Sequence, residues 1–242
     1  MNVALVLAAG RGSRMGADVP KQFLNAGGKP VLAHTLELFE NHPEIDQIVA
    51  VCGEKHIKTV EKLGKKHGFS KLTDVIEGGG TRRESSMRGV EFLCGEGLPE
   101  DTVVLIHDGA RPCVSEAVIS ANIRLAREQG ACVTAMPVTD TVLEVSGEGY
   151  VKSVPDRRLL WAAQTPQSFR LGVISAAHKH YEELLKASGE DGTVPEITDD
   201  SGLALLYGAK VALCKAGSDN FKLTDRKDLD YFRSLLRRRR GQ

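Results

Sequence analysis

The stretch L-A-A-G-R-G-S-R-M-G-A-D-V-P-K-Q-F-L, residues 7–24, follows the short apolar run V-A-L-V-L at residues 3–7. A continuous apolar run of this length with β-branched residues is typical of a buried parallel strand. In the turn that follows, three glycines let the backbone bend and present N–H groups to an anion, and three cations surround them. The glycines are Gly10, Gly12 and Gly16, and the cations are Arg11, Arg14 and Lys21. The small Ala8 and Ala9 leave room for a flat ring, so the stretch predicts a loop that holds a nucleoside triphosphate.

Two better-known phosphate loops do not match this stretch. Its glycines are spaced G-x-G-x-x-x-G, one residue longer than the dinucleotide-binding fingerprint. No G-K-[ST] ending follows, which excludes a Walker A loop. A dinucleotide-binding turn usually enters a helix at once, whereas Pro20 delays helical structure here until about Pro30. An ordinary glycine-rich connection between a strand and a helix remains as the alternative, and the three cations argue against it.

Strand and helix patterns alternate along the first half of the chain. The expected strands cover residues 3–7, 47–52, 74–77, 103–106 and 131–136, and the expected helices cover residues 30–41, 55–68, 82–94 and 115–129. Such alternation with short connections predicts an α/β fold: a Rossmann-like, mostly parallel sheet in a three-layer α/β/α arrangement. With 242 residues, we expect a single domain over residues 1–242. Ligands of such sheets bind at the carboxyl ends of the strands.

One segment, residues 138–163, breaks the alternation and reads as two strands joined by a glycine-containing turn at residues 146–149. We expect this segment to form a protruding β-hairpin arm. An isolated two-stranded hairpin is marginal in water, and this one carries apolar residues that it could not hide alone. These are Val142, Leu143, Val145, Tyr150, Val151 and Val154. The arm therefore packs on a partner subunit or, as the alternative, folds back on its own domain.

Composition excludes several classes of function. The 32 Lys and Arg balance the 32 Asp and Glu, which argues against a general nucleic-acid binder. The basic run Arg237–Arg240 reads as the solvated end of a last helix. No apolar stretch approaches the ~20 residues needed to span a bilayer, so we expect no membrane partner. The cysteines are odd in number and show no C-x-x-C pairing. They predict small buried side chains in a reducing compartment and hence a cytoplasmic protein: Cys52, Cys94, Cys113, Cys132 and Cys214.

Two further polar clusters follow expected strands. G-G-G-T-R-R-E-S-S at residues 78–86 combines close backbone approach with a helix start that favours anions or carbonyl oxygens. I-H-D-G-A-R-P at residues 106–112 places a carboxylate beside a guanidinium at the end of a buried strand. A merely capped helix start is the alternative for the first cluster. A structural pair of Asp108 with Arg111 is the alternative for the second.

Together these clusters resemble nucleotidyltransferases that act on sugar and polyol phosphates. The signature A-A-G-x-G-x-R-M-G with P-K-Q is shared with that class. H-D-G-A-R-P, D-T at residues 140–141, L-W-A-A-Q-T-P-Q-S-F at residues 160–169 and D-N-F-K-L-T at residues 219–224 are similar to the 2-C-methyl-D-erythritol 4-phosphate cytidylyltransferase family. The resemblance runs from about residue 3 to residue 232. It implies a cytidylyltransferase of the non-mevalonate isoprenoid pathway, with ribitol-5-phosphate cytidylyltransferase or another polyol- or sugar-phosphate nucleotidyltransferase as the alternative. A non-catalytic nucleotide-binding protein on the same scaffold is the alternative from another class.

The resemblance also implies roles for individual residues. The residues matched to catalysis are Arg14, Lys21, Arg157 and Lys222. Those matched to CTP binding are Ala8, Ala9, Gly10, Arg11, Gly12, Gly79, Gly80, Ser85 and Asp108. Those matched to the phosphorylated polyol are Asp108, Arg111, Thr141, Arg157, Thr165 and Lys222. The family resemblance further implies Mg²⁺ or another divalent cation, held mainly through CTP phosphates and water with Asp108 as a possible ligand, and a homodimer that exchanges β-arms. At Gly80 family members often carry a side chain, so base contacts there would come from the backbone alone.

Overall fold

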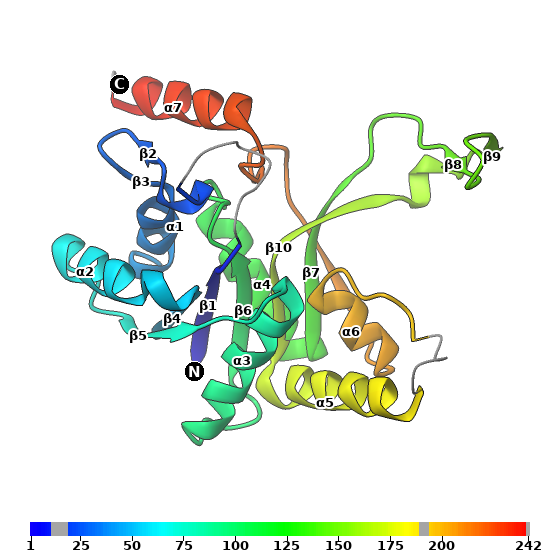
Figure 1. Ribbon diagram of the computed structural model, residues 1–242, viewed down its shortest axis with the longest axis horizontal. Helices are drawn as coiled ribbons and strands as arrows, with labels where there is room; N and C mark the ends of the chain where they lie inside the picture. Colours follow the sequence, from blue (N-terminus) through cyan, green and yellow to red (C-terminus); the bar gives the residue numbers. More distant parts are fainter. Residues whose placement is uncertain (11–18, 189–193, 241–242) are drawn as a thin grey trace.

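The computed structural model describes residues 1–10, 19–188 and 194–240. At residues 239 and 240 it describes the backbone alone. Its centre is a seven-stranded sheet with the strand order β11-β7-β10-β6-β1-β4-β5. The strands are β1 (Asn2–Ala8), β4 (Gln47–Cys52), β5 (Leu72–Glu77), β6 (Val103–Asp108), β7 (Ala131–Pro137), β10 (Trp161–Arg170) and β11 (Ala212–Lys215). Figure 1 shows the sheet running through the middle of the molecule. The five strands expected from the sequence are all present, extended by up to two residues at either end.

Helices cover both faces of this sheet. They are α1 (Val31–Glu40), α2 (Ile57–His67), α3 (Arg82–Gly95), α4 (Glu116–Gln129), α5 (Leu171–Ser188), α6 (Asp200–Leu206) and α7 (Arg226–Arg240). Alternate residues of β1 point to opposite faces, as the two-residue period of a strand requires. One set joins the core beneath α1, α2 and α4, and the other joins the core beneath α3, α5 and α6. This confirms the three-layer α/β/α arrangement and the four expected helices.

Local sequence explains where the site-forming helix begins. Thr81 precedes α3 and its hydroxyl accepts a hydrogen bond from the backbone N–H of Glu84, while the Glu84 carboxylate accepts one from the backbone of Thr81. This reciprocal capping box satisfies donors that a helix start otherwise leaves unpaired. It fixes the start of α3 directly after the glycines that follow β5. Before α1 the chain forms a short 3-10 turn, Lys21–Phe23, so helical structure appears earlier than Pro20 led us to expect.

Neither β10 nor β11 was predicted from the sequence, and β10 also departs from the parallel pairing that we expected. Strand β10 runs antiparallel to both β6 and β7 and lies between them, whereas the other neighbouring strands pair in parallel. Its first residues, Trp161–Ala163, pair with the end of β7. We expected these three residues in the arm, and that boundary was wrong. The main sheet continues along them because their backbone groups find partners on β7.

The arm itself is present but its strands are short. β8 (Glu144–Val145) and β9 (Val151–Ser153) pair antiparallel, and the N–H of Gly149 donates to the carbonyl of Ser146 in the expected turn. A 3-10 turn, Arg157–Leu159, leads back to β10. Figure 1 shows the arm extending away from the sheet. Its exposed apolar side chains include Leu143, Val145, Tyr150, Val151, Val154 and Leu159.

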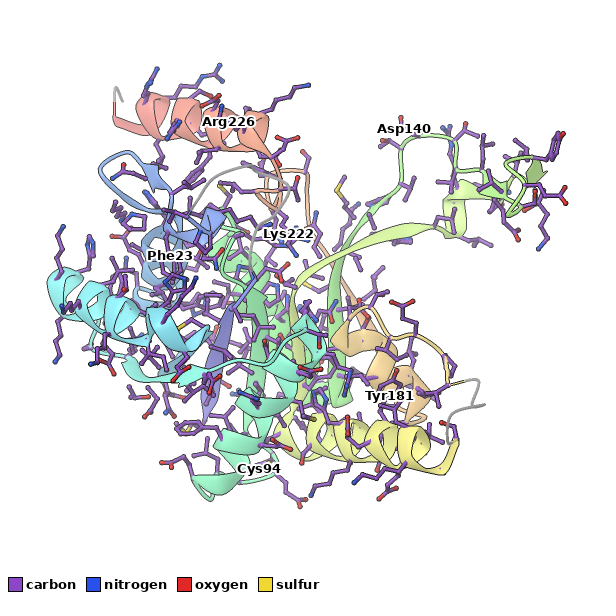
Figure 2. All side chains as sticks on the ribbon, viewed as in Figure 1. Phe23, Cys94, Asp140, Tyr181, Lys222 and Arg226 are labelled. Carbon is purple, nitrogen blue, oxygen red and sulfur yellow. The ribbon has the colours of Figure 1, made fainter. Side chains whose placement is uncertain are left out.

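The cysteine prediction was wrong for two of the five residues. Cys52, Cys132 and Cys214 are buried, but Cys113 is only partly buried and Cys94 is exposed near the end of α3, where Figure 2 labels it. Cys94 lies in the last turn of α3, where its Sγ donates to the hydroxyl of Ser175 on α5 at 3.5 Å while the side chain stays open to solvent. No helix among the described residues is long and apolar enough to cross a bilayer.

Candidate active site

The carboxyl ends of β1 and β6 and the loop before α3 enclose a cavity of about 270 Å³. Its position agrees with the rule that ligands of such sheets bind beyond the carboxyl ends of the strands. The lining residues are Leu7, Ala8, Ala9, Gly10, Lys21, Gln22, Gly79, Gly80, Thr81, Arg82, Ser85, Asp108, Ala110, Lys222 and Thr224. The cavity thus brings together nine residues proposed from the sequence, from segments spread between residues 8 and 222. Figure 2 shows Lys222 near the top of the sheet, below α7.

Among the residues that the structure describes, Asp108 is the only acidic one that lines this cavity, and three cations surround its carboxylate. Oδ2 lies 2.9 Å from Nζ of Lys222 and 3.2 Å from Nε of Arg111, and Oδ1 lies 3.5 Å from Nε of Arg82. Burial alone would raise the pKa of Asp108, but Lys222, Arg82 and Arg111 together hold it well below its usual range. The group is therefore a carboxylate, and the cluster of these four side chains carries a net positive charge that favours anionic ligands.

A second set of contacts fixes Asp108 from the interior side. Its backbone N–H donates to the hydroxyl of Thr165 at 3.0 Å, and that hydroxyl lies 3.0 Å from Nδ1 of His107. Nε2 of His107 lies 3.1 Å from the carbonyl oxygen of Arg111, which can only accept, so Nε2 carries the proton and Nδ1 accepts from Thr165. Burial lowers the pKa of His107 to about 4, which keeps the ring neutral. Thr165 and Arg111 therefore support Asp108 and do not line the cavity.

Arg111 is also tied to the segment that carries Lys222. Its Nη1 donates to the carbonyl of Asn220 at 2.8 Å, and the Asn220 amide donates to Gln164 and to the carbonyl of Thr165. These bonds anchor the D-N-F-K-L-T motif against β10. Lys222 consequently reaches Asp108 from a segment that follows all seven strands. The structural pair of Asp108 with Arg111, which was the alternative for this cluster, is therefore present, as part of a larger set of ion pairs.

The loop after β5 uses its own side chains to hold its backbone. The N–H of Gly79 donates to the hydroxyl of Ser85 at 3.1 Å, and the N–H of Gly80 donates to the carboxylate of Glu84 at 2.7 Å. A Cβ on Gly79 would lie 2.2 Å from Cβ of Glu84, so this position requires glycine. A Cβ on Gly80 would have only the flexible Glu84 carboxylate within 4 Å, at 3.3 Å. Side chains are therefore sterically possible at Gly80 but not at Gly79.

Sequence reasoning missed the roles of two residues. Nε2 of Gln22 donates to the carbonyls of Ala8 and Gly10 at 2.6 and 2.9 Å and so shapes the wall of the cavity. The P-K-Q motif contained it, but nothing in its pattern showed that its partners lie at the end of β1. Arg82 was placed at a helix start, and its pairing with Asp108 depends on the tertiary structure.

Several of the proposed residues do not join the cavity. Arg11, Gly12 and Arg14 lie outside the described residues. Thr141 and Arg157 are exposed on the arm, where Nη1 of Arg157 donates to the carbonyl of Thr139 at 2.8 Å. Within one chain they do not line the cavity with Lys21 and Lys222. Figure 2 labels Asp140, next to Thr141, on the extended arm.

A mostly parallel three-layer α/β fold, with a cation-rich cavity beyond the carboxyl ends of its strands, defines a nucleotide-binding α/β protein. The model of the 2-C-methyl-D-erythritol 4-phosphate cytidylyltransferase family matches residues 2–238, and the chain belongs to this family.

Similar proteins cover nearly the whole chain. A 2-C-methyl-D-erythritol 4-phosphate cytidylyltransferase of Desulforamulus reducens is 41% identical over 98% of this chain and 96% of its own length. One of Lachnospira eligens is 37% identical over 95% of this chain and 96% of its own length. The solved structure of 4-diphosphocytidyl-2C-methyl-D-erythritol synthase from Anaerococcus prevotii is 27% identical, with a TM-score of 0.79 over 98% of this chain and 96% of its own.

Proposed function

We propose that this protein joins CTP and 2-C-methyl-D-erythritol 4-phosphate to give 4-diphosphocytidyl-2-C-methyl-D-erythritol and diphosphate. Family membership supports the reaction, and the observation that carries it to this chain is the cluster around Asp108 inside the cavity. Both substrates are anions, and the described part of the cavity wall holds three cations, Lys21, Arg82 and Lys222, and one carboxylate. The excess of positive charge is what a site for two phosphorylated substrates requires.

The reaction is a displacement at phosphorus. An oxygen of the substrate phosphate attacks the α-phosphorus of CTP in line, the new P–O bond forms, and the bond to the β-phosphate oxygen breaks, so that diphosphate leaves. A phosphate monoester is already largely ionised near pH 7, so the attacking oxygen needs no general base. The protein must instead offset the repulsion between two anions and stabilise charge on the leaving group. We assign this role to Lys21 and Arg14 at the triphosphate, and to Lys222 at the substrate phosphate.

The cytosine pocket in this proposal is formed by Ala8, Ala9, Gly79, Gly80 and Ser85. All five line the cavity, and the two alanines leave a flat surface beside the glycines. The N–H groups of Gly79 and Gly80 and the Ser85 hydroxyl already donate within the loop, so the backbone carbonyls, which can accept from the exocyclic amine of cytosine, are the groups that read the base edge. Gly10, with Arg11 and Gly12, would then hold the triphosphate.

A divalent cation fits this site only in part. Within the described ranges, Asp108 is the one carboxylate that lines the cavity, and those ranges hold no group of three or more metal-ligating side chains. Mg²⁺ is commonly held by one or two carboxylates together with substrate phosphates and water. We propose that Asp108 supplies one such ligand, and that the ion, when bound with CTP, neutralises phosphate charge.

The arm supports a homodimer with exchanged arms. Its apolar side chains are exposed, and Thr141 and Arg157 are remote from the cavity of their own chain. A partner subunit would bury the apolar side chains of the arm. Its cavity would receive Thr141 and Arg157, with Arg157 at the substrate phosphate. Sedimentation of the purified protein tests the assembly, because a monomer at all concentrations contradicts it. A cytoplasmic location stays a prediction.

The decisive assay is diphosphate release with CTP and each of two polyol phosphates. We expect turnover with 2-C-methyl-D-erythritol 4-phosphate and little with D-ribitol 5-phosphate. Preference for ribitol phosphate would identify the alternative enzyme. CTP binding without turnover on either would indicate a non-catalytic binding protein.

A further inference from the structure

The first residue of α6, Asp200, is a buried carboxylate that belongs to no role discussed above. It is fully buried, its Oδ2 accepts from Nη1 of Arg82 at 2.7 Å, and its Oδ1 accepts from the hydroxyl of Ser86 at 2.5 Å. Both donors lie on the first turns of α3. An isolated buried charge is energetically costly, and the ion pair with Arg82 offsets that cost for the Asp200 carboxylate.

Arg82 connects this carboxylate to the cavity. Its Nη1 pairs with Asp200, its Nε lies 3.5 Å from Asp108, and the residue lines the cavity wall. Its third nitrogen, Nη2, is buried and has no hydrogen-bond partner in the part of the chain that the structure describes. A buried donor without a partner is unfavourable, and a ligand oxygen would relieve it.

Asp200 is itself rigidly placed. The neighbouring Asp199 caps α6 by accepting from the N–H of Gly202 at 2.9 Å, and it also accepts from the amide of Gln167 on β10 at 2.8 Å. The N–H of Ser201 donates back to Gln167 at 2.9 Å. The start of α6 is therefore fixed to the central sheet, and Asp200 is a fixed point from which Arg82 is held.

We propose that Asp200 is a positioning residue: it holds the guanidinium of Arg82 so that Nη2 donates to a phosphate oxygen of the bound substrates. Two carboxylates share Arg82, and this division keeps its planar fork from pairing in full with Asp108. Without Asp200, Arg82 would turn toward Asp108 and compete with Lys222 for the same carboxylate. The inference rests on the proposed function, because phosphorylated substrates supply the oxygen.

A double-mutant cycle in kcat/KM tests this role. We expect Asp200→Asn and Arg82→Ala each to lower kcat/KM by about 10- to 100-fold, as misplacement of a binding group does. The combined variant should lose no more than Arg82→Ala alone, because Asp200 acts through Arg82. Full activity of Asp200→Asn, or an undiminished effect of that change in the Arg82→Ala background, overturns the proposal.

The ion pair made by the next residue of α3, Arg83, provides the matched control. Nη1 of Arg83 lies 2.5 Å from the carboxylate of Glu182 on α5, and neither residue lines the cavity. Glu182→Gln removes an ion pair that holds α3 without touching Arg82. We expect kcat/KM within about twofold of the unmodified protein, as for other perturbations remote from a site. A loss equal to that of Asp200→Asn would mean general loosening of α3 and would refute positioning.

Two further measurements keep the result interpretable. If Asp200→Asn does not fold, Arg82→Lys carries the test, since lysine keeps the charge but cannot donate to both carboxylates and a ligand. A loss of about 10-fold or more with an unchanged circular dichroism spectrum supports the proposal, and unchanged kcat/KM overturns it. If the unmodified protein has no turnover, the proposed function fails. CTP binding by calorimetry across the same variants then decides the role of Asp200 separately.

Discussion

Replacing Asp108 by Asn should destabilise the protein even though the change conserves shape. The amide leaves Lys222, Arg111 and Arg82 facing one another, at positions 2.9, 3.2 and 3.5 Å from the former carboxylate, with no charge of opposite sign between them. Removing one partner of a buried ion pair typically costs about 3–5 kcal/mol. Lys222 and Arg82 retain partial contact with solvent, and Arg82 keeps Asp200, so we expect the lower limit, about 3 kcal/mol.

Urea unfolding at neutral pH measures this loss. With a slope of about 3 kcal/mol per molar urea, the midpoint should fall by about 1 M. The advantage of the unmodified protein should be complete above the ordinary pKa of Asp, about 4, because the folded pKa is depressed. It should shrink as the pH falls further toward that lower folded value.

An exposed carboxylate supplies the control. Asp156 pairs with Arg158 at 2.6 Å on the surface of the arm, and Asp156→Asn should leave the urea midpoint unchanged. Equal midpoints for Asp108→Asn and the unmodified protein would show that the three cations do not depend on Asp108, and the electrostatic reasoning given for the site would be wrong.

Three other outcomes follow from the proposed site. Lys21→Ala and Arg14→Ala should each lower turnover by about 10²–10³-fold, or about 2.7–4 kcal/mol, with the fold retained, because each removes a charge that stabilises the transition state; near-normal turnover of either variant contradicts that role. CTP should be preferred over UTP, at about 1–3 kcal/mol for each unpaired group at the base edge, and purine nucleotides should be excluded by size; equal use of ATP and CTP in competition is the contrary result. Mixing Arg157→Ala with Lys21→Ala protein should restore about a quarter of normal activity if subunits exchange and arms cross, because about half of the dimers are mixed and each has one intact site of two; mixed dimers without regained activity would mean that the arm serves its own chain.

The fold could be predicted from the sequence for the strands whose buried residues form apolar runs. β1, β4, β6 and β7 appeared as apolar runs because both faces of these strands are covered by helices, while the fifth predicted strand, β5, lies at the sheet edge and is only partly buried. Strand β10 did not appear as an apolar run, since its centre is polar although buried. Gln167 and Ser168 are satisfied there by Asp199 and Asn122, which are distant in sequence. A strand whose buried side chains are paired with polar partners leaves no periodic apolar signal.

Individual residues of the candidate site could be predicted from the sequence, but the ion pairs between them could not. Asp108 was identified because it ends a buried strand and precedes Gly-Ala-Arg. Its partners Arg82 and Lys222 come from a helix start and from a segment near the chain end, and only the folded sheet brings them together. The sequence likewise showed an apolar arm, yet nothing in it marked where the arm ends and the main sheet resumes at Trp161.

The insertion of β10 between β6 and β7 determines the order in which a growing chain can fold. β7 pairs only with β10 and β11, which are both synthesised after it. A nascent chain that has reached residue 137 can therefore assemble β5, β4, β1 and β6 as a parallel unit, while β7 must wait for residues 161–170 to arrive between it and β6. Asp108 is in place early on the first unit, and Lys222 is added only when almost the whole chain is available. The side of the cavity formed by β1 and β6 can thus assemble early in synthesis, whereas Lys222, which completes the cluster around Asp108, is added only after all seven strands.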